Sequence, residues 1–147
     1  MSTKESSSVR PAPSNRPAIM GTRHVIAAGH YLAAHAGFEI LEAGGNAVDA
    51  GVAGIAVGVL QTDKVNFGGV APMIIYVAKT REVHCIDGLG VWPQAITPDY
   101  FQKNHNSKIP PGVLRSVVPA APDAWITALE RFGTMTFAEV ASAAIRF

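Results

Sequence analysis

The chain has little charge, a single cysteine and no long apolar run. Charged side chains make up 16% of its 147 residues and the formal net charge is +1. No basic stripe therefore favours a nucleic acid or an anionic membrane as a partner. Cys85 has no partner for an internal disulfide, and its strand-like surroundings predict a buried, inert thiol. The apolar residues 47–60 are too few to span a bilayer.

The sequence also lacks the short motifs that reveal an active site most directly. Its five histidines show no metal-ligand spacing, and we expect them to be solvent-facing or singly hydrogen-bonded. No Gly-x-Ser-x-Gly elbow is present. The pairs Gly44-Gly45 and Gly68-Gly69 lack the residues of a P-loop or a dinucleotide fingerprint. From the residues alone the chain is a soluble α/β domain with glycine-rich turns, and a small nucleotide-binding domain is one alternative.

What the sequence does contain is enough apolar material for one packed domain. Hydrophobic residues make up 48% of the chain, and the length suits a single domain. Residues 1–20 are rich in serine and proline and lack the apolar core of a signal peptide. They are predicted to be a disordered tail, with the domain in residues 21–147. This composition favours a cytoplasmic location.

An opening strand at residues 25–28 and a helix beginning near His30 are predicted first. The helix pattern places four side chains on the inward face: Tyr31, Ala34, Phe38 and Leu41. Gly44 is placed to end the helix in the left-handed conformation. Asn46 then caps a second, apolar helix over 47–60, and Asp49 supports that cap. These residues are interpreted as structural, with no catalytic role.

The remaining chain alternates strands, loops and helices. The predicted elements are a glycine turn at 66–72, a buried strand at 73–78, a hairpin partner at 83–87, a short helix around 99–102 and helices over 122–131 and 136–147. Thr136 and Glu139 form a capping box for the last helix, whose inward side chains are Val140, Ala141, Ala144 and Ile145. This helix reaches Phe147 without a C-cap, and we expect the chain to be a piece of a larger assembly.

Three segments, in the same order, resemble the large subunit of the γ-glutamyltransferase family. They are Ala43-Gly44-Gly45-Asn46-Ala47-Val48-Asp49-Ala50, then Asn66-Phe67-Gly68-Gly69 with the following hairpin, then Val118-Pro119 to Trp125 with Arg131-Phe132-Gly133-Thr134-Met135. The resemblance covers residues 21–147. It implies an α/β fold, the four-layer αββα sandwich of N-terminal-nucleophile hydrolases, of which this chain is the N-terminal portion.

The resemblance also implies a self-processing enzyme that cuts its own precursor. Its nucleophile is a threonine at the new N-terminus of a separate small subunit, where the free α-amino group serves as base. No threonine of this chain matches the cleavage site, so no catalytic residue is assigned here. The implied partners are the remainder of the large subunit, the small subunit and a small-molecule amide. Neither a metal nor an organic cofactor is implied.

The segment after the hairpin departs from the family pattern at the substrate site. Typical members place an arginine shortly after the hairpin's aspartate, where it binds the α-carboxylate of the γ-glutamyl group. In Asp87-Gly88-Leu89-Gly90-Val91-Trp92-Pro93, Leu89 stands at that arginine position and Gly90 at the following glutamate. The predicted substrate-binding residues are Leu89, Gly90, Trp92 and Arg115. Ordinary packing is the alternative for Trp92, and an exposed surface position is the alternative for Arg115.

The favoured hypothesis is therefore a self-processing amidohydrolase or acyltransferase that acts on an amide other than a γ-glutamyl one. One alternative is a true γ-glutamyltransferase that uses glutathione-like substrates. A second alternative is a non-catalytic truncated paralogue or binding module. The acyl group, the acceptor, the balance of hydrolysis and transfer and the oligomeric state are not specified by the sequence.

Overall fold

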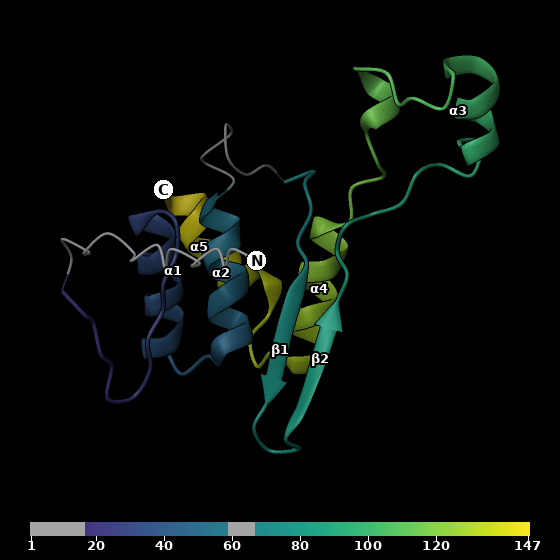
Figure 1. The fold of residues 1–147 in the computed structure, drawn as a ribbon. Helices are drawn as coiled ribbons and strands as arrows, with labels where there is room; N and C mark the ends of the chain where they lie inside the picture. Colours follow the sequence, from purple (N-terminus) through teal and green to yellow (C-terminus); the bar gives the residue numbers. More distant parts are fainter. Residues whose placement is uncertain (1–16, 59–66) are drawn as a thin grey trace, which may run out of the picture.

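The computed structural model describes residues 17–58 and 67–147 of the chain. Its elements, in order, are α1 (Tyr31–Glu42), α2 (Ala47–Gly58), β1 (Met73–Val77), β2 (Glu82–Ile86), α3 (Pro98–His105), the 3₁₀ turn η1 (Val113–Arg115), α4 (Ala121–Phe132) and α5 (Phe137–Arg146). Helices α1, α2 and α5 pack together, and α4 lies beside the β1–β2 hairpin (Figure 1). The interpretations of residues 1–16, of Asn66 and of the helix end at Leu60 lie outside the described residues.

Helix α1 begins and ends where local signals place it, but the strand before it does not form. Residues 25–28 have no regular structure, so the predicted opening strand is wrong: no strand of the described chain pairs with them. The His30 side chain caps α1 by accepting a hydrogen bond from the Leu32 amide. Gly44 has φ +95°, which confirms its predicted left-handed role.

The buried face of α1 differs in part from the predicted one: Leu41 packs against the core as predicted, whereas Tyr31 and Phe38 are exposed. Small residues and one isoleucine are buried, namely Ala33, Ala36, Gly37 and Ile40, while the Tyr31 side chain is 75% exposed. A Cβ added to Gly37 would lie 2.8 Å from the Ala50 carbonyl oxygen of α2. The two helices approach too closely for large side chains, so Tyr31 and Phe38 turn outward.

The core lies where α2, α4 and α5 meet. Trp125, Val52 and Val140 are its largest fully buried apolar side chains. The predicted α4 is confirmed, with Gly133 as its C-cap, and the predicted capping box of α5 is present between Thr136 and Glu139. On α5, Val140 and Ala141 are buried as predicted. Ile145 is instead 82% exposed, because it lies beyond the face that α1 and α2 cover.

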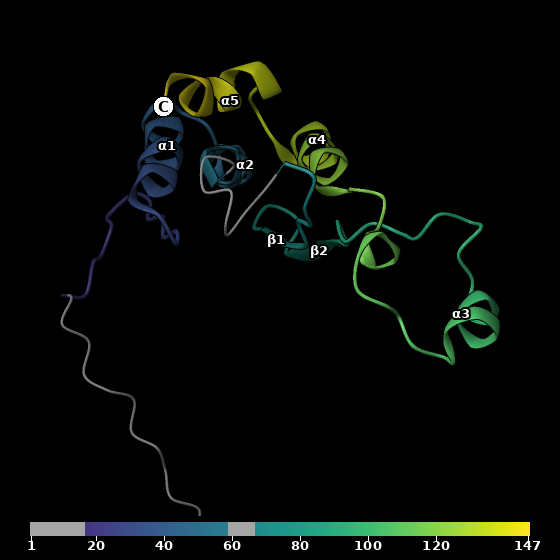
Figure 2. The same ribbon diagram turned by 90° about the horizontal axis from the view of Figure 1, so that it is seen from above.

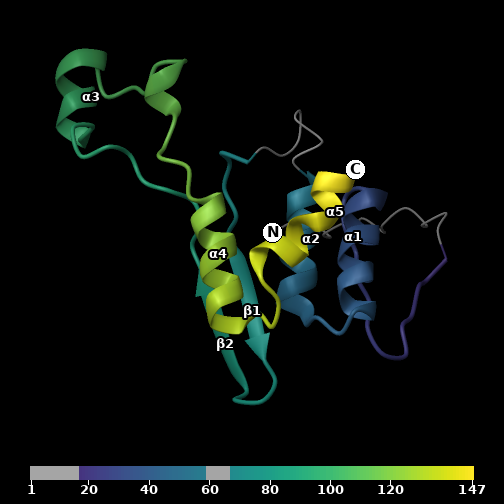
Figure 3. The ribbon, with the colours of Figure 1, turned by 180° about the vertical axis from the view of Figure 1, so that it is seen from behind.

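Strands β1 and β2 form an antiparallel hairpin in which Met73 pairs with Ile86 and Val77 with Glu82. Helix α4 covers one face of the hairpin, as Figures 1 and 3 show from opposite sides. Side chains on the other face are exposed and apolar: Ile74, Tyr76, Val83 and Cys85. The predictions of a fully buried strand and of a buried Cys85 are therefore wrong, because only one face of the hairpin has a cover in the described chain.

Residues 92–117 form an arm that leaves the end of β2 and returns at α4 (Figures 1 and 2). The arm carries α3 and η1. Helix α3 is longer than the predicted short helix, because Thr97 caps it, Pro98 opens its first turn and Asn106 ends it in the left-handed conformation. Among the described helices, none is long and apolar enough to cross a membrane.

Candidate functional site

The turn that follows β2, residues 88–92, contains three of the four predicted substrate-binding residues. Two backbone hydrogen bonds fix it to neighbouring segments: the Ala71 amide donates to the Gly88 carbonyl at 2.8 Å, and the Val118 amide donates to the Val91 carbonyl at 2.8 Å. The turn therefore lies between the segment that enters β1 and the segment that returns from the arm. Its position is set by backbone contacts on both sides.

Glycine is required at two positions of this turn. Gly88 has φ +56° and Gly90 has φ +86°, a region that L side chains rarely adopt. A Cβ at Gly88 would collide with the Ala71 carbonyl oxygen, and a Cβ at Gly90 would collide with the Val118 carbonyl oxygen. Leu89 is consequently the side chain that the centre of the turn presents, and it is 47% exposed.

The two remaining predicted residues lie in different surroundings. The indole ring of Trp92 packs against Phe101 of α3, with 5.3 Å between ring centroids, so Trp92 joins the turn to the arm. Arg115 lies on η1, out on the arm beside α3 (Figure 1). It is exposed, with Nη2 3.5 Å from the Ile109 carbonyl oxygen. The structure thus groups Leu89, Gly90 and Trp92, but it places Arg115 on a separate element.

A buried carboxylate organises the other end of the molecule. The Asp49 side chain is fully buried. It accepts hydrogen bonds from the Asn46 amide (2.8 Å), the Thr134 amide (3.0 Å), the Thr134 hydroxyl (2.7 Å) and the Met135 amide (3.2 Å). Asn46 adds a bond from its Nδ2 to the Phe132 carbonyl oxygen at 2.6 Å. The start of α2 is thereby joined to the link between α4 and α5.

The electrostatics of Asp49 support the structural role predicted for it. Burial raises the pKa of its carboxyl, but the hydrogen bonds from Asn46, Thr134 and Met135 together lower the pKa below its usual value. A carboxylate so fully engaged is held ionised and is not available as a base. The sequence predicted the local cap, but it gave no signal for the long-range contact with Thr134.

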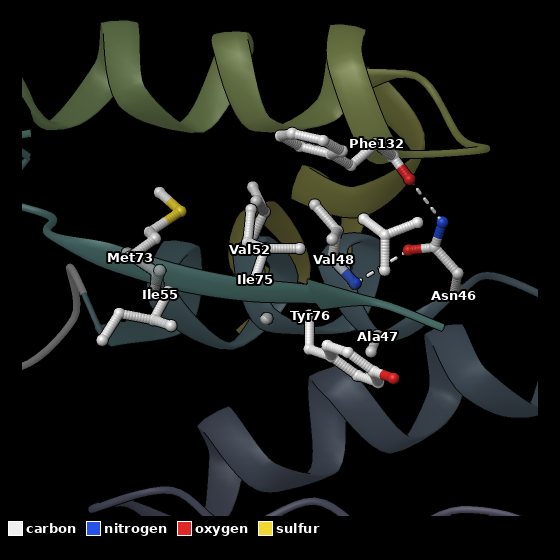
Figure 4. A pocket seen from close by; sticks show the side chains of 12 residues that line it. Asn46, Ala47, Val48, Val52, Ile55, Met73, Ile75, Tyr76 and Phe132 are labelled. Carbon is white, nitrogen blue, oxygen red and sulfur yellow. Dashed lines mark hydrogen bonds between the residues drawn. The ribbon is translucent and has the colours of Figure 1, made fainter. Parts of the chain in front are cut away.

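A cleft of about 450 Å³ lies between α2 and the whole length of β1. Figure 4 shows β1 crossing in front of α2, with the Phe132 ring on one side of the strand and Tyr76 on the other. Most of the residues that line the cleft are apolar, among them Val52, Ile55 and Met73. This cleft can receive apolar groups, but it contains no acid, base or nucleophile pair.

Four of the five described histidines make one polar side-chain contact each and also lie against an aromatic ring, whereas His105 packs against Tyr100 and Phe101. His24, His35 and His84 each lie within 3.5 Å of one glutamate, and His30 caps α1. Within residues 17–58 and 67–147, no three His, Cys, Asp or Glu side chains gather as metal ligands. The described residues therefore provide a shaped turn, a structural carboxylate and apolar surfaces. They bring together no set of groups that could catalyse a reaction unaided.

Comparison with known proteins finds a matching family model and related sequences. The gamma-glutamyltranspeptidase family model matches residues 33–147. The glutathione hydrolase-like YwrD proenzyme of Bacillus subtilis (strain 168) is 32% identical over 83% of this chain and 23% of its own length. The acylase ACY 1 proenzyme of Pseudomonas sp. (strain V22) is 36% identical over 85% of this chain and 24% of its own length.

The fold comparison agrees. The crystal structure of Helicobacter pylori gamma-glutamyltranspeptidase matches with a TM-score of 0.77 and 27% identity, over 88% of this chain and 38% of that chain. The expected fold class, part of an N-terminal-nucleophile hydrolase sandwich, is confirmed. The chain spans about a quarter of the length of the two curated relatives described above.

Proposed function

The chain belongs to the gamma-glutamyltranspeptidase family, and we propose that it forms the N-terminal part of the large subunit of a self-processing amidohydrolase. Two observations support this proposal. The relatives described above are named as proenzymes. The family model matches residues 33–147, within the region that the resemblance assigns to the large subunit. The chain's partners in the proposal are the remainder of the large subunit and a small subunit that begins with threonine.

The proposed reaction passes through an acyl-enzyme. The α-amino group of the N-terminal threonine accepts the proton of the threonine hydroxyl, and the oxygen attacks the amide carbonyl. Backbone amides stabilise the negative oxygen of the tetrahedral intermediate. The amine leaves, and water releases the acyl group as a carboxylic acid. This chain contributes recognition of the acyl group to that sequence of steps, and the proposal requires no metal or cofactor.

The observation that carries the choice of substrate is Leu89. An aliphatic side chain cannot pair with the carboxylate that a γ-glutamyl group presents, and Gly90 leaves no side chain at the next position. The acylase name of the 36% identical relative supports the same direction. We therefore assign the enzyme an amide whose acyl part is not γ-glutamyl, with hydrolysis favoured over transfer.

A true γ-glutamyl hydrolase is the second candidate. The name of the 32% identical relative, a glutathione hydrolase-like proenzyme, favours it. This candidate requires a cation from another element to bind the substrate carboxylate. Arg115, an exposed arginine on η1 of the arm, is the cation that this candidate assigns to that role.

The test uses the complete protein, as its gene encodes it, purified from its source. Intact mass and N-terminal sequencing should show two polypeptides, one of which begins with threonine. The processed protein should hydrolyse a butanoyl anilide at least as well as a γ-glutamyl anilide. The first lacks the α-amino and α-carboxylate groups of the second. Exclusive cleavage of the γ-glutamyl compound would establish the second candidate, and an unprocessed, inactive protein would refute both.

A further inference from the structure

Residues 88–90, the glycine-rich part of the turn at residues 88–92, have a backbone conformation that the Leu89 side chain does not determine. Both glycines adopt left-handed φ angles, and the neighbouring carbonyl oxygens of Ala71 and Val118 occupy the space that a Cβ would need. The hydrogen bonds to Gly88 and Val91 hold those neighbours in place. The backbone of the turn is therefore fixed, whatever stands at position 89.

This fixed backbone excludes the glutamate that the family pattern places at position 90. A glutamate at position 90 would have to adopt φ +86°, and its Cβ would meet the Val118 carbonyl oxygen. Main chain would have to move to relieve that contact, since a carbonyl oxygen cannot rotate away as a flexible side chain can. The backbone at Gly90 thus accounts for the missing glutamate, and the identity of Leu89 accounts for the missing arginine.

The charges near the turn point in the same direction. Asp87, which is exposed, directly precedes the turn, and no lysine or arginine occurs between Arg81 and Lys103. A carboxylate brought to Leu89 would lose water without gaining a counter-ion from these residues, which is unfavourable. Methylene and methyl groups brought to the same place would gain contact with the half-exposed leucine.

Resting on the proposed function, we propose that the 88–90 turn selects amides with an uncharged, apolar acyl chain. Leu89 is the specificity-determining contact with the end of that chain. Gly90 is a positioning residue, because its lack of a side chain lets the Val118 segment close against the turn. The substrate class is therefore the amides of short aliphatic carboxylic acids.

The experiment measures kcat/KM of the complete processed protein on acetyl, butanoyl and glutaryl anilides. The butanoyl and glutaryl chains differ by a terminal carboxylate, and the acetyl chain lacks the methylenes that the proposal brings to Leu89. We expect the wild type to prefer the butanoyl compound. Leu89→Ala should lower kcat/KM for it by about tenfold or more and change the acetyl value little. Leu89→Arg should reverse the preference between butanoyl and glutaryl compounds.

The control variant is Val113→Ala, which truncates an exposed apolar side chain on η1, 83% exposed against 47% for Leu89. It should leave all three values within about twofold of the wild type. A wild type that prefers glutaryl would overturn the proposal. Equal losses on acetyl and butanoyl compounds in Leu89→Ala would do the same. A protein that is neither processed nor active refutes the proposed function itself, and a processed, active protein with an unselective profile refutes the turn's role alone.

A pair of glycine variants tests the positioning role of Gly90. Gly112 also has a left-handed φ, +104°, but an added Cβ there would have no neighbour within 4 Å. Gly90→Ala and Gly112→Ala therefore share the conformational strain and differ in the collision with Val118. We expect Gly90→Ala to lower the butanoyl-to-acetyl ratio of kcat/KM severalfold, with the Gly112→Ala ratio unchanged. Equal ratios in the two variants would overturn the role of Gly90.

Discussion

Replacing Asp49 by asparagine tests whether the buried carboxylate holds the helices together. The substitution keeps the shape of the side chain and exchanges one acceptor oxygen for an NH₂ group. If the amide nitrogen takes the place of Oδ1, it faces the backbone N–H groups of Thr134 and Met135. If it takes the place of Oδ2, it faces the Asn46 N–H and the Thr134 hydroxyl. One or two donors of these part-buried hydrogen bonds lose their acceptor in either orientation.

The magnitude follows from those lost partners. A buried donor left without an acceptor costs about 1–3 kcal/mol. The remaining oxygen loses its charge, which weakens the hydrogen bonds that it still accepts. We expect Asp49→Asn to lower the free energy of unfolding by about 3 kcal/mol, within a range of about 2–5 kcal/mol. The urea midpoint of the transition that includes this chain should fall by that free-energy loss divided by the measured urea slope.

The assay is equilibrium urea unfolding of the complete protein, followed by fluorescence. Trp125 is buried in the core that Asp49 helps to assemble, so its emission contributes to the signal together with that of Trp92. Glu130→Gln is the matched control, because Glu130 is an exposed acid on α4. It should change stability by no more than about 0.5 kcal/mol. A loss below about 1 kcal/mol for Asp49→Asn would refute the inference that this carboxylate connects α2 to the α4–α5 link.

Three further predictions concern pH, capping and the uncovered hairpin face. Because the pKa of Asp49 is lowered in the folded state, its contribution to stability is present above the unfolded value, about 3.9, and is lost as the pH falls through the folded value. The stability gap between the wild type and Asp49→Asn should therefore narrow below about pH 4 in urea titrations, and a gap independent of pH would contradict this assignment. Thr136→Ala should cost about 1 kcal/mol, because it removes the hydroxyl that accepts from the Glu139 amide, whereas Ser142→Ala on the same helix should change the urea midpoint little. Cys85 should react with a maleimide at least about tenfold more slowly in the assembled protein than in the same protein unfolded in urea, because apolar surfaces of this kind are normally covered. Equal rates in peptide mapping would show that the face stays open.

Local signals in the sequence predicted local structure well. The left-handed glycine at Gly44, the Asn46 cap and the capping box at Thr136 each depend on residues within a few positions, and each is confirmed. The bond from Thr134 to Asp49 joins segments far apart in the chain, and no periodicity encodes it. The α1 face was predicted wrongly for a related reason. Hydrophobic size favoured Tyr31, while the close approach to α2 selected small residues.

At the candidate site, too, some features could be predicted from the sequence and others only from the structure. The departure at Leu89 was visible only because a resemblance supplied the expected residue. The sequence does not show that the backbone at Gly90 also excludes a side chain there. That exclusion depends on the Val118 carbonyl oxygen beside Gly90. Arg115 shows the limit of reasoning from charge. The charge of Arg115 suggested a substrate-binding role, but the residue lies on a different element from the turn, η1 of the arm.

The two faces of the hairpin connect the fold to the proposed site. On one face, Met73 and Ile86 pack into the core under α4. On the other, Ile74 and Tyr76 are 80% and 62% exposed, although they are as apolar as the covered side chains. In a sandwich of two sheets between helices, such a face is the one that meets the second sheet. Leu89 follows the end of β2 by three residues, and we expect the polypeptide that covers this face to extend to the turn. Specificity should then depend on how that polypeptide and the fixed 88–90 backbone confine the acyl chain.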